Sequence, residues 1–141
     1  MGLDMFLNAR RFFWRGDEAP AVKDLPAGYE VKYVIIETAY WRKANAIHQW
    51  FVDNVQEGQD NCGTYEVDRE KLAELVDICK QVLADPTKAG ELLPTADGFF
   101  FGSTEYDNWY KNSLQATIEQ VEKALATLPE NTWSFEYLAS W

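Results

Sequence analysis

Several segments of the chain alternate apolar and polar residues or concentrate β-forming residues, which predicts strands. The alternating segments are Leu3–Phe13 near the start and Thr132–Leu138 near the end. Tyr29–Thr38 is rich in β-branched and aromatic residues and is apolar on both faces near its end, so we expect it in the centre of a sheet. Thr64–Val67 predicts a short strand, and the apolar run Phe99–Phe101 predicts another strand or extended piece.

Three other segments repeat their apolar residues with the helical period. The first helix is expected from about Tyr40 to Gln56. The second follows Asp68, a good N-cap residue, and ends near Asp85, while the third follows Thr104 and is ended by Pro129. Their expected core stripes are Ala44, Ile47, His48, Phe51 and Val55; Leu72, Leu75, Val76, Cys79, Val82 and Leu83; and Tyr110, Leu114, Ile118, Val121, Leu125 and Leu128.

The order of these elements favours an α+β fold. Most connections between the strands are too short or too irregular for regular parallel crossovers. We therefore expect a mostly antiparallel sheet of about four or five strands, with three helices packed on one face of it. The length of 141 residues is that of one domain, so residues 1–141 are expected to share a single core.

The net charge of −10 narrows the classes of partner. An acidic chain is poorly suited to nucleic-acid backbones and to anionic membrane surfaces, so neither is expected as a direct partner. The charge suits a basic protein partner, or it serves solubility alone. No apolar run approaches the roughly 20 residues of a membrane span, and the first residues lack the pattern of a secretory signal. These features predict a cytoplasmic protein.

The usual signatures of catalysis and of metal binding are missing from the sequence. The chain has no H-E-x-x-H, G-x-S-x-G, P-loop or EF-hand pattern. Cys62 and Cys79 are too few for a disulfide scaffold and are expected to be reduced thiols. A pair of Cys62 with the single histidine, His48, is conceivable, but no third group to orient it is identifiable. We expect no cofactor and no metal, and the missing motifs favour binding over catalysis.

The segment from Tyr40 to Phe51 concentrates polar and aromatic residues within three helical turns. We identify Trp41, Arg42, Asn45, His48 and Trp50 as the candidate ligand- or partner-binding residues. In one interpretation the polar side chains recognise a ligand and a tryptophan ring stacks on it. In the other, the polar side of this helix is merely solvated, and His48 satisfies a neighbouring backbone group.

Three motifs carry a resemblance to a known family. The opening Met1–Leu7, the run Tyr40–His48 and the run Gly98–Asp107 resemble a family of small phage and prophage proteins, and the resemblance covers nearly the whole chain. It implies a phage or mobile-element origin and a cytoplasmic life inside an infected bacterium. It brings no catalytic residues with it. The basic and aromatic cluster Arg10–Arg15 departs from the family, in which this segment is more variable.

Three functions remain open at this stage. The first is a phage accessory protein that binds, without catalysis, a host protein with a basic surface and so inhibits it, for example in antiviral defence. The second is a small-molecule or nucleotide-binding protein, or a minor enzyme, with a pocket on the first helix. The third is a virion or assembly component, which would form a homo-oligomer.

Overall fold

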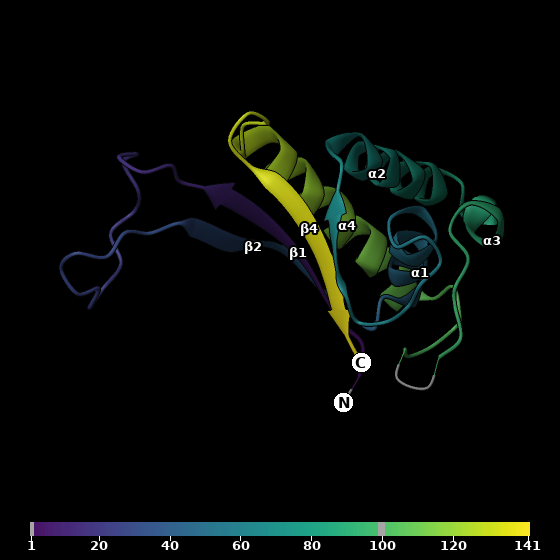
Figure 1. The fold of residues 1–141 in the computed structure, drawn as a ribbon. Helices are drawn as coiled ribbons and strands as arrows, with labels where there is room; N and C mark the ends of the chain where they lie inside the picture. The colour runs from purple at the N-terminus through teal and green to yellow at the C-terminus, as the bar shows by residue number, and fades with distance from the viewer. Residues whose placement is uncertain (1, 99–100) are drawn as a thin grey trace.

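The computed structural model describes residues 2–98 and 101–141 and confirms the α+β class (Figure 1). One antiparallel sheet of four strands has the order β2-β1-β4-β3. Three long helices accompany it, together with a 3₁₀ turn, η1, and the single-turn helix α3. The elements are β1 Asp4–Phe12, β2 Tyr33–Arg42, α1 Asn45–Asn54, β3 Thr64–Val67, α2 Arg69–Ala84, η1 Pro86–Lys88, α3 Ala89–Leu92, α4 Asn108–Thr127 and β4 Ser134–Ser140.

The long helices α1, α2 and α4 lie on one side of the sheet, as the sequence predicts (Figure 1). The alternation of the first strand explains this arrangement, because Leu3, Met5, Leu7 and Ala9 are completely buried against the helices. Phe135, Tyr137 and Ala139 of β4 are buried in the same way. Each strand therefore gives one row of side chains to the core and leaves the other row on the opposite face.

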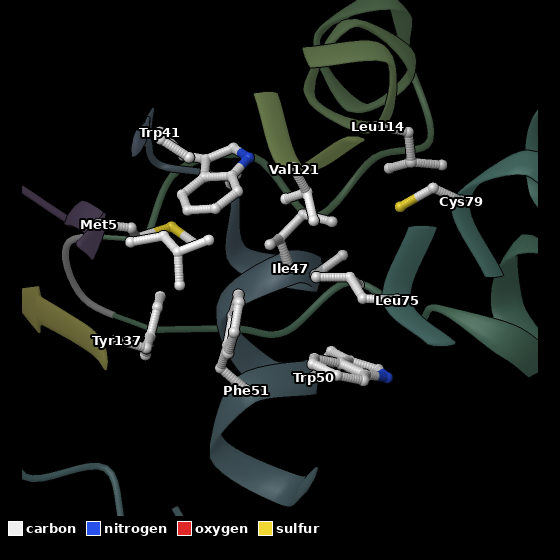
Figure 2. Packing of buried hydrophobic residues seen from close by; sticks show 14 of the residues in the cluster. Met5, Trp41, Ile47, Trp50, Phe51, Leu75, Cys79, Leu114, Val121 and Tyr137 are labelled. Atoms are coloured by element: carbon white, nitrogen blue, oxygen red, sulfur yellow. The ribbon is translucent and has the colours of Figure 1, made fainter. Parts of the chain in front are cut away.

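The core joins the sheet to all three long helices (Figure 2). At its centre the rings of Phe51 and Tyr137 stack with their centroids 3.8 Å apart and 5° between their planes. Leu75 and Cys79 of α2 meet Leu114 of α4 at the other side of this cluster.

The boundary between the second strand and the first helix differs from the prediction. The strand begins later, at Tyr33, and it continues through Trp41 to Arg42, while α1 begins only at Asn45. Trp41 pairs with Met5 and is buried, so the strand period continues where a helix is predicted. Lys43 then turns the chain with a φ of 52°. The expected central position of this strand is also wrong, since β2 lies at the edge of the sheet.

Gln120 of α4 covers part of the free edge of β2. Its side-chain amide accepts the backbone N–H of Tyr40 at 3.0 Å and donates to the carbonyl of Tyr40 at 3.3 Å. The pairing between β1 and β2 also shifts by one residue between Leu7 and Asn8, beside Thr38. Both features interrupt the regular hydrogen-bonding edge that another strand would need.

The outer ends of β1 and β2, with the connector between them, extend away from the helices as an arm (Figure 1). Two large aromatic side chains of this arm are strongly exposed, Trp14 at 73% and Tyr29 at 69%. The connector contains no helix or strand from residue 13 to residue 32, so residues 29–32, which are expected in the second strand, belong to the connector instead.

The remaining predictions concern the later helices and the apolar run. The helix α2 follows Asp68 as predicted. The helix α4 starts later than expected: Asp107, not Thr104, is its N-cap, and its carboxylate accepts the N–H of Tyr110 at 3.1 Å. Of the strand expected at Phe99–Phe101, Phe101 lies in a bend, and residues 99 and 100 are outside the described residues.

Candidate functional site

His48 lies inside the protein, in a chain of polar groups that the sequence did not indicate. The residue is completely buried. Its Nδ1 is 2.6 Å from the hydroxyl of Tyr137, and its Nε2 is 2.8 Å from Oδ1 of Asp60. Because a carboxylate oxygen accepts, His48 donates from Nε2. In the neutral imidazole, Nδ1 then accepts from the hydroxyl of Tyr137. The same oxygen of Asp60 accepts the indole N–H of Trp141 at 3.1 Å.

Burial keeps the tyrosine of this chain in its neutral form. Removal from solvent raises the pKa of Tyr137 well above its ordinary value, because the phenolate would be the costlier form in the interior. The hydroxyl therefore keeps the proton that it can donate to Nδ1 of His48. Every polar atom of the imidazole has a partner within the protein, which is the arrangement of a structural histidine.

Asn45 fastens the start of α1 to the segment between α3 and α4. Its side-chain amide donates to the carbonyls of Phe101 at 3.1 Å and Ser103 at 2.7 Å, and its oxygen accepts the N–H of Ala96 at 3.0 Å. The residue is 4% exposed. Three backbone groups of a loop thus depend on this one side chain.

The two tryptophans of the predicted site are also interior residues. The indole of Trp41 donates to Oγ1 of Thr117 at 2.8 Å, which ties β2 to α4. Trp50 packs edge-to-face on Phe51 with ring centroids 5.2 Å apart. Both are almost fully buried, so neither ring presents a face on which a ligand could stack without a change of structure.

Arg42 lies on the other side of the sheet from these four residues. Its Nη1 donates to Oδ1 of Asp4 at 2.6 Å, and the hydroxyl of Tyr40 donates to the same oxygen at 2.5 Å. These bonds from Tyr40 and Arg42 lower the pKa of Asp4. The structure thus does not gather the five predicted residues into one pocket, and a role for any of them in ligand binding stays a prediction.

A small hollow does lie at the start of α1. It has a volume of ≈10 Å³ between Asn45 and the first turn of α4. This is about the space of one water molecule, far from the roughly 300 Å³ or more of small-molecule sites. The structure therefore offers no preformed ligand pocket at this point.

The two cysteines lie in different surroundings. Cys79 is buried, and its removal from solvent raises the pKa of its thiol to about 12, so it is an inert core residue. Cys62 is exposed in a turn. Among residues 2–98 and 101–141, no group of three or more His, Cys, Asp or Glu side chains is placed to hold a metal ion. No helix within these residues is long and apolar enough to cross a membrane.

The sheet face opposite the helices carries exposed aromatic and apolar side chains among its charged ones. We call it the open face. Residues paired across an antiparallel ladder lie on the same face, so the register assigns its members. They are Asp4, Phe6, Asn8, Arg10 and Phe12 of β1; Tyr33, Ile35, Glu37, Tyr40 and Arg42 of β2; Thr64 and Glu66 of β3; and Ser134, Glu136, Leu138 and Ser140 of β4.

A row of carboxylates crosses the open face. Asn8 pairs with Glu37 on one side and with Glu136 on the other, and Glu136 pairs with Glu66. The row therefore spans all four strands and contains three glutamates. In the part of the chain that the structure describes, none of the three forms an ion pair. Glu136 and Glu66 are directly opposite each other, and like charges in that arrangement destabilise a sheet, so this pair works against folding.

Apolar and aromatic side chains border the acidic row on both sides. On one side Phe6 and Tyr40 are in ring contact at 5.3 Å, with Leu138 next to them in the register. On the other side lie Ile35, which is 55% exposed, and Tyr33, which is 49% exposed. Exposed aromatic residues are enriched in protein-binding surfaces relative to the rest of a protein surface.

The opposed carboxylates give a stability prediction. We expect Glu66→Gln to raise the free energy of unfolding by up to about 1 kcal/mol, because it removes the like-charge pair with Glu136. Urea denaturation measures the change. Glu18→Gln, in the exposed connector, is the matched control and should leave stability unchanged. A loss of stability in Glu66→Gln would show that its carboxylate has a favourable partner instead.

No family model matches the chain, and the comparisons with curated proteins and with solved structures also found no match.

Proposed function

We propose that this protein acts by non-catalytic binding of a partner protein with a basic surface, and that the open face makes the contact. The observation that carries the proposal is the row of Glu37, Glu136 and Glu66. Opposed carboxylates lower the stability of the free protein. A cationic surface that bound to them would neutralise their charge and remove this repulsion. Lysine and arginine side chains of a partner would supply that neutralisation.

The charge of the whole chain supports the same class of partner. A net charge of −10 creates a field that speeds the encounter with a basic protein. The aromatic and apolar residues beside the row would add the short-range contact that charge alone does not supply. Electrostatic steering of the partner and short-range contact with it would then both involve the open face.

The family resemblance supplies the biological setting of the proposal. A phage or prophage accessory protein of this kind would occupy a functional surface of a host protein and so inhibit it, with antiviral defence as the expected context. Nucleic-acid-binding host proteins are a class with the required basic surface.

Capture of a partner from bacterial lysate tests the proposal. The tagged protein should retain a basic protein at low salt and lose much of it at high salt, because exposed charges are screened. The triple variant Glu37→Gln, Glu66→Gln, Glu136→Gln should retain little of it. A control triple with the same change of charge replaces the exposed glutamates Glu70, Glu91 and Glu119, on α2, α3 and α4. Equal loss in both triples, or retention of no basic protein, would contradict the proposal.

A further inference from the structure

A second feature of the open face lies where the arm leaves the body of the protein. A hollow of ≈410 Å³ is bounded by Arg10, Phe12 and Tyr33 of the arm and by the turn from Glu130 to Ser134 that precedes and begins β4. This volume is within the range of small-molecule sites, about 300 to 1,000 Å³. The hollow is distinct from the acidic row and from the first helix.

Arg10 is the unusual residue of this hollow. Its guanidinium lies over the ring of Tyr33, with Cζ 3.9 Å from the ring centroid. Its Nε is buried and has no hydrogen-bond partner. Within the described residues, the guanidinium forms no ion pair with a carboxylate. A buried donor without an acceptor costs free energy, so the site lacks an acceptor that would satisfy it.

We propose that this hollow binds an oxyanion, a carboxylate or a phosphate, attached to a flat apolar group. A guanidinium stacked on an aromatic ring keeps its N–H groups in its own plane, where they match the two oxygens of such an anion. Phe12, Tyr33 and Trp133 supply ring surface for the apolar part of the ligand. Because Arg10 belongs to the lining of the hollow, its guanidinium would donate to the oxyanion of the ligand.

Glu130 is expected to weaken the binding of the anion. This exposed carboxylate belongs to the lining of the hollow and repels a second negative charge. Glu130→Gln therefore tightens the binding of the anion. The inference does not rest on the proposed protein partner, and its test contains no protein besides this chain.

The test is an NMR titration of the full chain with three small probes: benzoate, phenyl phosphate and the neutral benzamide. Benzoate, phenyl phosphate or both shift the resonances of the Arg10 Nε–H and the Trp133 indole N–H in a saturable way, and benzamide does not. Which anion binds more tightly distinguishes a carboxylate ligand from a phosphate ligand. Arg10→Gln weakens the binding at least about tenfold, and Arg10→Lys, which keeps the charge but not the fork, weakens it less.

Arg11 offers a matched control on the same strand. Its guanidinium lies over the ring of Phe13, with Cζ 4.7 Å from the centroid, and it does not line the hollow. Arg11→Gln leaves the affinity of the anions unchanged. The proposal is overturned if neither anion gives a saturable shift, if benzamide binds as well as benzoate, or if folded Arg10→Gln binds like the unaltered protein.

Discussion

His48→Ala is expected to lower the free energy of unfolding by about 3–5 kcal/mol. The substitution leaves a cavity at a completely buried position and removes both hydrogen bonds of the imidazole. The hydroxyl of Tyr137 then has no acceptor in the interior, since its partner is gone. Chemical denaturation followed by tryptophan fluorescence measures the change.

Two further variants help to interpret the loss of stability in His48→Ala. Tyr137→Phe removes one hydroxyl and keeps the ring stacked on Phe51, so it should cost only about 1–2 kcal/mol. Gln49→Ala, at the neighbouring and less buried position of α1, should change stability by less than about 0.5 kcal/mol. If His48→Ala proved as stable as Gln49→Ala, the imidazole would not be a structural group, and a role in binding would become the better account.

Asn45→Ala is expected to cost about 2–4 kcal/mol. The side chain makes three hydrogen bonds to backbone groups of Ala96, Phe101 and Ser103. Without it these groups lose their acceptor or donor in a part-buried region, which is costlier than the loss of an exposed bond. Denaturation gives the global loss.

Hydrogen exchange at the N–H of Ala96 adds a local readout for the same variant. This amide donates to Asn45, so its exchange should become faster in Asn45→Ala. Asn112→Ala, at an exposed position of α4, is the control and should leave both measurements near those of the unaltered protein. Unchanged exchange at Ala96 would contradict the proposed anchoring of the loop.

The sequence was most informative where a period is long and regular. The alternation of Leu3, Met5, Leu7 and Ala9 predicted which side of the first strand faces the helices, because burial follows the period of two directly. The sequence pattern misplaced the boundary between the second strand and the first helix, at Tyr40–Arg42. Trp41 fits a strand pattern and a helix pattern equally well. Only the pairing with Met5 decides between them.

The partners of the buried polar residues could not be predicted from local patterns. His48 meets Asp60, 12 residues away, and Tyr137, 89 residues away. Such contacts depend on how the sheet and α1 come together. The sequence placed His48 in the expected core stripe of the first helix and allowed both a structural and a ligand-binding interpretation, but it could not identify the partners of the imidazole.

The neighbours on the open face could not be predicted from local sequence patterns either. Glu37, Glu136 and Glu66 belong to three strands and become neighbours only through the strand order and register. In the sequence they are three among 23 acidic residues, and nothing distinguishes them. Expecting the second strand in the centre of the sheet would also have placed its neighbours wrongly.

The positions of the predicted site residues in the structure favour the sheet, and not the first helix, as the proposed contact surface. Asn45, His48, Trp41 and Trp50 have their contacts inside the protein, whereas the open face keeps exposed charge and aromatic surface. The inhibitory function proposed from the charge and the resemblance therefore gains a specific surface, and α1 becomes part of the framework that holds the sheet.

Calorimetric titration of the captured basic partner tests this account most directly. The partner is titrated into the unaltered protein, into the triple variant of Glu37, Glu66 and Glu136, and into the control triple of Glu70, Glu91 and Glu119. We expect the first triple to weaken binding by at least about tenfold, while the control triple stays within about twofold of the unaltered protein. Equal affinities of the two triples would show that the partner senses only the net charge, and the open face would not be its binding surface.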